Sequence, residues 1–206
     1  MTSPRIFTIG HSNHALEQFL ALLSRHGVTA VADVRSSPYS RFCPHFNRDA
    51  LTATLRESGI RYSYLGRELG GRSDDPSCYE DGQVQYERVV RTATFRKGLT
   101  RVVDGASNYR IVLMCAEKEP LECHRTLLIA RALMSEGNDV VHILGNGGLE
   151  THECTMNRLL EQFNLSPSGD LFQPREELLA HAIALQARRV AFISGSSDTN
   201  KRRPLR

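Results

Sequence analysis

The sequence predicts an α/β protein, a single domain built on a mostly parallel open sheet of about five strands flanked by helices. Short runs of β-forming residues alternate with longer helical patterns, which is the order of β–α–β units. Of the 206 residues, 40 % are hydrophobic and 24 % are charged, a balance that supports one core and excludes a disordered chain. These observations together indicate a Rossmann-like architecture.

The first strand and helix follow from hydrophobic periodicity. Arg5–Gly10 (RIFTIG) is the strand, and apolar residues then recur at helical spacing until Gly27, which ends the helix. Ser12 or Asn13 is expected to cap that helix. The second strand is Val28–Val34.

The middle of the chain continues the alternation. Asn47 is expected to cap a short helix that ends near Gly59, and Ile60–Leu65 is the third strand. The Gly-rich segment 66–83 is a long loop, which is typical of a lid, a binding loop or disorder. A helical pattern then covers residues 84–103.

The second half of the fold begins with an apolar strand, Tyr109–Cys115, whose composition suggests a central position. A helix over residues 126–137 leads to the fifth strand, Asp139–Leu144. Two further helices, Glu150–Asn164 and Pro174 to about Val190, complete the chain.

The formal charge of +3 lies in the C-terminal tail. Residues 194–206 hold four basic residues and one acidic residue, so the rest of the chain is neutral. Composition therefore gives no broad nucleic-acid-binding face. We expect one domain over residues 1–193, with a helical extension over about 150–190, and a disordered basic tail over 194–206.

Cysteine usage and hydropathy indicate the compartment. No segment resembles a signal sequence or reaches the ~18 apolar residues of a membrane span. Five cysteines form an odd set in a chain large enough to fold without disulfides, so reduced thiols are expected. We expect a soluble cytoplasmic protein with no membrane partner, and we exclude a secreted disulfide scaffold.

The segment MCAEKEPLECHR carries the strongest chemical signal. Ligands of open parallel sheets bind beyond the carboxyl ends of the strands. Cys115 ends the central strand there, and Cys123, His124 and Arg125 begin the next helix, where a thiol pKa is lowered. We assign Cys115 and Cys123 as catalytic candidates, either nucleophile or redox thiol, with Glu117 as a proton carrier.

Other uses of these residues stay open. Each cysteine alone is as well explained by packing. A zinc site of Cys115, Cys123, His124 and His11 has weak support, because the cysteines are eight positions apart and no CxxC is present. A disulfide switch is equally open. A cysteine phosphatase loop is excluded, because neither cysteine has an arginine six positions later. Metal and cofactor stay unassigned.

Several arginines fall at predicted strand ends, where together they indicate an anionic ligand. The neighbouring histidines, a serine and an asparagine add hydrogen-bonding groups that suit a small anion or a nucleotide. The residues assigned to substrate binding are His11, Ser12, Asn13, Arg35, Arg41, Arg67, His124 and Arg125.

Four motifs identify a family. TIGHSN, DVRSSPYSR, YLGRELGGR and MCAEKEPLECHR, followed by HIL, occur in that order between about Ile6 and Leu144. They resemble the domain-of-unknown-function family numbered 488. The resemblance implies a compact intracellular α/β domain, mostly from bacteria and archaea, with the two cysteines and the CHR triplet as its signature. It supplies no reaction.

Three functions remain as hypotheses. The leading one is a cysteine-dependent enzyme that acts on a small anionic or nucleotide-like ligand. The second is a nucleic-acid-binding or repair-associated module in which arginines contact phosphates and the cysteines are structural. The third is a metal or redox sensor.

Overall fold

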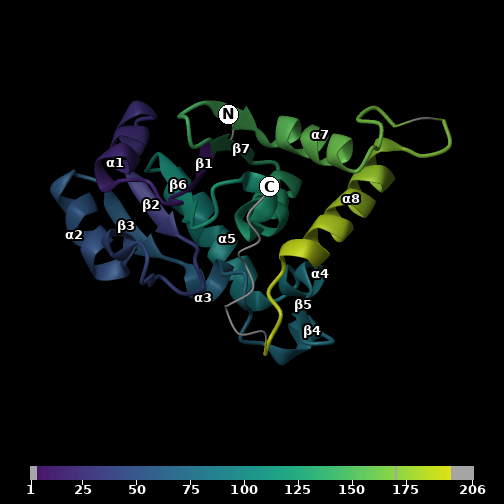
Figure 1. Cartoon of the computed structure of the whole chain (residues 1–206), viewed down its shortest axis with the longest axis horizontal. Coiled ribbons are helices and arrows are strands. Elements are labelled where there is room, and N and C mark those ends of the chain that lie inside the picture. Colours follow the sequence, from purple (N-terminus) through teal and green to yellow (C-terminus); the bar gives the residue numbers. More distant parts are fainter. Residues whose placement is uncertain (1–3, 170, 196–206) are drawn as a thin grey trace.

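The computed structural model describes residues 4–169 and 171–195, and it confirms the α/β class. Six strands form one sheet in the order β3–β2–β6–β1–β7–β8, with only β8 antiparallel to its neighbour (Figure 1). The strands are β1 (Arg5–Gly10), β2 (Ala30–Asp33), β3 (Arg61–Tyr64), β6 (Ile111–Cys115), β7 (Asp139–Ile143) and β8 (Leu149–Thr151). The sixth strand, β8, takes up the start of the helix expected from Glu150.

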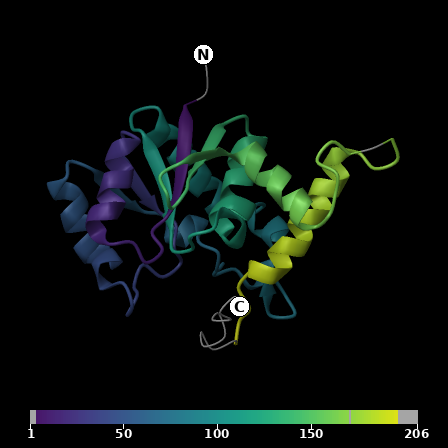
Figure 2. The same ribbon diagram turned by 45° about the horizontal axis from the view of Figure 1, so that its top comes forward.

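Helices cover both faces of this sheet (Figure 2). The first face carries α1 (Leu16–Arg25) and α2 (Arg48–Glu57), and the second carries α5 (Ala93–Ala106), α6 (Arg131–Ser135), α7 (His152–Gln162) and α8 (Arg175–Val190). Along β1 the side chains alternate between the two cores, because Phe7 and Ile9 join the first and Ile6 joins the second. No helix in the described part of the chain is long and apolar enough to cross a membrane.

The two central strands, β1 and β6, form the switch point of the topology. From β1 the chain crosses to β2 over the first face, and from β6 it crosses to β7 over the second. The crossovers therefore diverge just beyond the carboxyl ends of these strands. In open α/β sheets this divergence creates the ligand crevice.

Two expected helix caps differ from the structure. The N-cap of α1 is Ala15, so neither Ser12 nor Asn13 caps it. Asn47 does stand at the N-cap of α2, but its Oδ1 accepts the backbone N–H of Ser40 (2.7 Å) instead of a helix amide. The Ser12 hydroxyl instead donates to Asn13 Oδ1 (3.2 Å), so in both places short polar side chains bond groups outside the helix.

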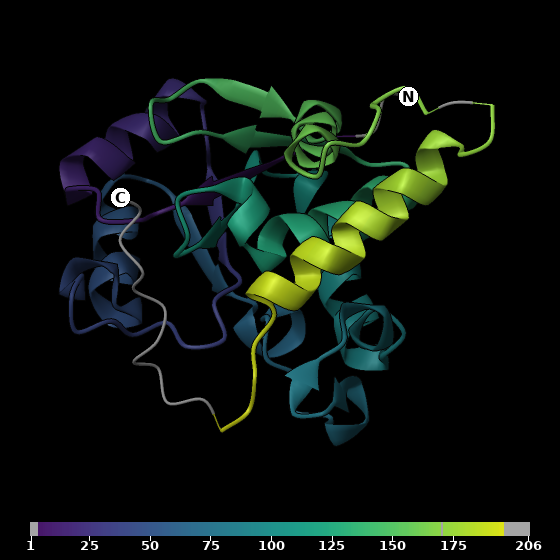
Figure 3. The same cartoon turned by 45° about the vertical axis from the view of Figure 1, so that its right-hand side comes forward.

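The long segment after β3 folds back on the C-terminal extension (Figure 3). It contains α3 (Gly66–Leu69) and a hairpin of β4 (Tyr79–Glu80) and β5 (Gln83–Val84), and the helix expected over 84–103 is divided into α4 (Tyr86–Val89) and α5. Backbone bonds join the hairpin to the residues after α8, from Val84 N to Phe192 O (2.9 Å) and from Ser194 N to Gly82 O (2.7 Å). Of the expected tail, residues 196–206 lie outside the described residues.

Candidate active site

The site begins at the carboxyl ends of β1 and β6. The His11 N–H donates to the Cys115 carbonyl (2.8 Å), and the Ser12 N–H donates to the Ala116 carbonyl (2.9 Å). These bonds continue the parallel ladder past the last paired residues, so two loops that later diverge start side by side. The sheet thus delivers Cys115 into the crevice of the switch point.

Arg125 holds the loop that returns to Cys123. The Arg125 side chain is fully buried and donates to the carbonyl oxygens of Glu117 (Nη1, 2.6 Å) and Lys118 (Nη2, 3.1 Å). A buried guanidinium needs such acceptors, so the loop and the arginine fix each other. The following helix opens as a π-helical segment (Arg125–Ala130), a geometry frequent at functional sites.

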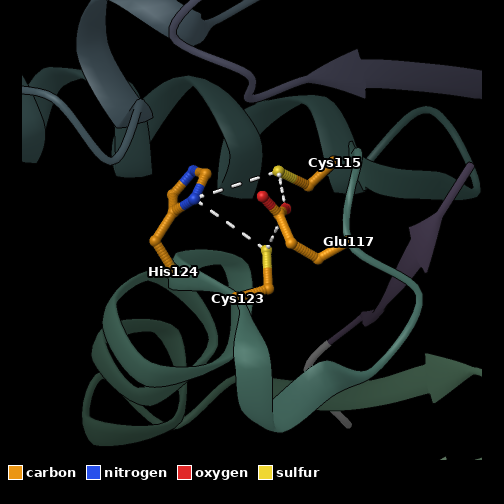
Figure 4. Close-up of side chains that lie close together, drawn as sticks. All are labelled: Cys115, Glu117, Cys123 and His124. Atoms are coloured by element: carbon orange, nitrogen blue, oxygen red, sulfur yellow. Dashed lines mark hydrogen bonds between the residues drawn. The ribbon is translucent and has the colours of Figure 1, made fainter. Parts of the chain in front are cut away.

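Four side chains meet at this point: Cys115, Glu117, Cys123 and His124 (Figure 4). One donor atom from each lies within 4.8 Å of all the others. The two sulfur atoms lie 2.9 and 3.1 Å from Glu117 Oε2, and each lies 3.9 Å from His124 Nδ1. His124 Nε2 is 3.0 Å from the Val34 carbonyl, which can only accept, so Nε2 carries a proton.

The environment separates the acidities of the two thiols. Burial and the neighbouring Cys123 raise the pKa of Cys115 well above its ordinary value. Burial also opposes ionisation of Cys123, but the hydrogen bond from Cys115 and the charge of Arg125 outweigh it and lower the pKa of Cys123. The first negative charge of the pair therefore resides on Cys123.

The other two members of the cluster respond to that charge. Burial and the Cys123 thiolate raise the pKa of Glu117. Burial disfavours the charged form of His124, but Cys123 outweighs this effect and raises the pKa of the imidazole. The four groups therefore share their protons as one unit, and no member titrates independently.

A second polar network adjoins the cluster. Arg35 donates to Asp33 through Nε (2.9 Å) and Nη2 (2.6 Å), and Nη1 donates to His11 Nε2 (3.2 Å). Burial and the Arg35 charge lower the pKa of His11 to about 4, so this imidazole is neutral near pH 7. A buried neutral histidine and a buried ion pair thus support the end of β2 beside the site.

Two glycines allow the backbone to approach the cluster. A Cβ on Gly10 would lie 1.8 Å from the Glu117 carbonyl oxygen, and one on Gly71 would lie 3.0 Å from the His124 ring. Any side chain on Gly10 would therefore displace the loop that carries Glu117.

A pocket of about 270 Å³ opens over the cluster. Cys115, Glu117 and His124 line it, whereas Cys123 is not among the lining residues; both cysteines are 2 % exposed. The other lining residues are Arg35, Ser36, Ser37, Tyr39, Gly71, Arg72, Tyr86, Ala116, Glu122, Val190 and Phe192. Because Val190 ends α8 and Phe192 follows it, the C-terminal extension supplies part of the wall.

The comparison with protein families decides which family the chain belongs to. Residues 15–132 match the family model described as Domain of unknown function DUF488, which is more than half of the chain. The chain belongs to this family. The matched part of this DUF488 protein contains all four residues of the cluster. No curated protein and no solved structure matches the chain.

The substrate-binding residues expected from the sequence do not all gather at the pocket. Arg35 and His124 line it, and Arg125 and His11 support it from behind. The remaining four lie elsewhere: Ser12 and Asn13 form the turn before α1, Arg41 is exposed on the loop after β2, and Arg67 lines a different depression.

That second depression, of about 860 Å³, is larger but contains no cysteine or histidine. It lies along β3 and is lined by the arginines Arg48, Arg56, Arg67 and Arg101 together with polar and acidic residues. Chemistry decides between the two, so we take the smaller pocket of the DUF488 protein as the candidate active site.

Sequence reasoning missed several pocket residues. Tyr86 lies in a stretch that reads as an ordinary amphipathic helix, and Phe192 lies beyond the family motifs. The glycines of TIGHSN and GRELGG were the available signal for the close backbone contacts of the site, because a glycine at a strand end often marks a close backbone approach. They did not point to Tyr86 or Phe192.

Proposed function

We propose that this DUF488 protein is an enzyme that takes a small anionic or nucleotide-like ligand into the pocket over the cluster, with Cys115, Cys123 and Glu117 as its reactive centre. One observation carries the proposal: two sulfurs, a carboxylate and an imidazole converge at the floor of a pocket, at the switch point of a parallel sheet. Clusters of this kind in a concave site are typical of catalysis.

Two arginines support an anion of limited size in this pocket, against the carboxylates of Glu117 and Glu122 in the same lining. The raised pKa of Glu117 reduces that repulsion. Arg72 and Arg35 line the pocket, and Arg35 keeps one N–H of Nη1 beyond those that bind Asp33, Phe46 and His11. A volume of about 270 Å³ is just below the range of roughly 300 to 1,000 Å³ for small-molecule sites. A phosphate or carboxylate group with a small substituent fits both features.

The roles of the reactive groups follow from their positions. Glu117 faces the pocket and lies within hydrogen-bond distance of both sulfurs, so it is placed to pass a proton between the ligand and the thiols. Cys115 lines the pocket and so faces the ligand. Cys123, whose pKa is lowered, accepts a hydrogen bond from Cys115 and so affects the ligand through Cys115. Such thiols stay reduced in the cytoplasm, which is where we place the protein.

Calorimetric titration with inorganic phosphate and with adenosine monophosphate tests the ligand class. Arg72→Gln should weaken binding roughly tenfold, the effect of about 1.4 kcal/mol from one charged hydrogen bond. Arg56→Gln, at the larger depression, is the matched control and should bind as the wild type does. Absence of binding by the wild type, or equal binding by Arg72→Gln, contradicts the proposal.

The same variants separate the nucleic-acid hypothesis from the enzyme. Fluorescence anisotropy with a labelled single-stranded oligonucleotide measures that binding at two salt concentrations. If Arg56→Gln loses salt-dependent oligonucleotide binding and Arg72→Gln keeps it, the arginines that line the larger depression form the functional surface, and the enzyme proposal is replaced.

A further inference from the structure

The four-residue cluster has the donor set of a transition-metal site. Two cysteine sulfurs, one imidazole nitrogen and one carboxylate oxygen are the ligand types that zinc takes in proteins. We propose that Cys115, Cys123, His124 and Glu117 bind one zinc ion. This inference rests on the proposed function in placing the reactive centre at these residues, and it adds the cofactor. Because four protein ligands fill a tetrahedral ion, Glu117, which faces the pocket, is the ligand that would have to leave the ion to carry a proton.

The distances fit a tetrahedral ion after small movements. With zinc–sulfur bonds of about 2.3 Å and zinc–nitrogen bonds of about 2.0 Å, a sulfur and a nitrogen ligand stand roughly 3.5 Å apart. Each sulfur here is 3.9 Å from His124 Nδ1. The sulfurs lie 2.9 and 3.1 Å from Glu117 Oε2, so each sulfur–oxygen distance must increase by about half an ångström. Rotation about side-chain torsions supplies shifts of that size without moving the backbone.

The orientation of His124 is that of a ligand. Its Nε2–H donates to the Val34 carbonyl at the end of β2, which turns Nδ1 toward the two sulfurs. A backbone carbonyl bound to the far nitrogen fixes the ring and is the usual support of a metal-bound histidine. Gly71 adds to this, because the backbone there packs directly against the ring.

A divalent ion would leave the site balanced in charge. Bound to the ion, two thiolates and a carboxylate would carry three negative charges in a buried space, which Arg125 alone cannot offset. The Arg125 guanidinium gives its Nη1 and Nη2 bonds to carbonyl oxygens, and only the Arg125 backbone N–H reaches the cluster, donating to Cys123 Sγ at 3.4 Å. A divalent cation together with this guanidinium would make the site neutral.

Accessibility favours coordination over direct attack by a thiolate. A nucleophilic cysteine is exposed to its substrate. Here both sulfur-bearing side chains are buried, each residue being 2 % exposed, and of the two only Cys115 is among the residues that line the pocket. Both sulfurs would be thiolates on a metal. Over residues 4–169 and 171–195, no other group of three such side chains converges.

Metal analysis of the full-length protein, purified without chelators, tests the inference. We expect about one zinc ion per chain in the wild type and in the Cys43→Ser and Cys154→Ser controls. The double variant Cys115→Ser/Cys123→Ser should retain under roughly a tenth of an equivalent. Glu117→Gln should reduce zinc affinity while retaining binding, because three ligands remain.

Cobalt substitution keeps the test decisive if the double variant fails to fold. Cobalt(II) bound by the wild type should show a thiolate-to-metal charge-transfer band and the strong visible bands of a four-coordinate ion. Wild-type protein with a folded circular dichroism spectrum that takes up neither zinc nor cobalt would overturn the inference, as would metal uptake that is equal in a folded double variant.

Failure of this inference is distinguishable from failure of the proposed enzyme function. If phosphate binds in the pocket and depends on Arg72 while no metal binds, the enzyme proposal stands and the metal is excluded. If zinc binds with the expected cysteine dependence while neither phosphate nor adenosine monophosphate binds, the zinc site stands and the ligand class is wrong.

Discussion

Replacing Gly10 with alanine should destabilise the protein through the loop of the active site. The new Cβ would lie 1.8 Å from the Glu117 carbonyl oxygen and 2.8 Å from its carbonyl carbon, both backbone atoms. Real Cβ atoms essentially never approach another heavy atom closer than 3.0 Å, so strand and loop must separate by more than an ångström. Neither is free to move, because Gly10 pairs with Cys115 in the sheet and Arg125 binds the same carbonyl.

The size of the effect follows from the bonds at risk. A hydrogen bond to a charged group contributes about 1.5 to 3 kcal/mol, and overpacking of a rigid core costs about 1 to 3 kcal/mol. We expect the free energy of unfolding to fall by about 2 to 4 kcal/mol. For a chain of this length, that lowers the melting temperature by roughly 10 °C.

Urea unfolding followed by circular dichroism measures this difference. Gly145→Ala is the matched control, because its Cβ would meet only the flexible end of Lys118 at 2.9 Å. We expect the control to unfold within about 0.5 kcal/mol of the wild type. A Gly10→Ala protein as stable as Gly145→Ala would show that the loop yields easily, and the rigid support of Glu117 would be refuted.

Two further predictions concern buried charge. The pKa values of His11 and His152 are lowered from 6.5 to about 4, chiefly by burial, so the unfolded chain binds more protons between those pH values. Stability should therefore fall as pH drops from 6.5 toward 4, by about 3 kcal/mol for each histidine, and urea midpoints that stay constant over this range would contradict it. Asp33→Asn should cost about 3 to 5 kcal/mol, because it leaves Arg35 buried without its counter-charge, whereas Asp139→Asn, which breaks an exposed pair, should cost under about 1 kcal/mol. Equal losses in urea unfolding would show that burial does not govern these pairs.

The strands were predictable because their signal is local. The run Ile111–Cys115 is buried at every position, as its continuous apolar sequence indicates for a central strand. β8 was missed because three residues are too few for periodicity, and its assignment depends on pairing with β7. The predicted side-chain caps were wrong for a similar reason. The Asn47 side chain accepts a hydrogen bond from the Ser40 backbone, a tertiary contact that the local sequence does not encode.

The site was predictable in its chemistry but not in its assembly. The motif MCAEKEPLECHR brought forward Cys115, Glu117, Cys123 and His124, which the structure places together. The positions of the arginine side chains were harder to predict, because the sequence at a strand end does not show whether an arginine is buried against a carboxylate such as Asp33 or is exposed. Only the fold shows that Arg35 faces the pocket.

Protection of Cys115 from alkylation tests the central claim most directly, namely that a small anion enters the pocket against the cluster. Chelator-treated protein is reacted with iodoacetamide, with and without inorganic phosphate, and each cysteine is quantified by peptide mass spectrometry. Because Cys115 is 2 % exposed and its pKa is raised, its modification is slow and is followed at alkaline pH until it is measurable without phosphate. We predict that phosphate slows modification of Cys115 and leaves Cys43, which lies outside the pocket lining, unchanged. Modification of Cys115 at the same rate with and without saturating phosphate would contradict the account.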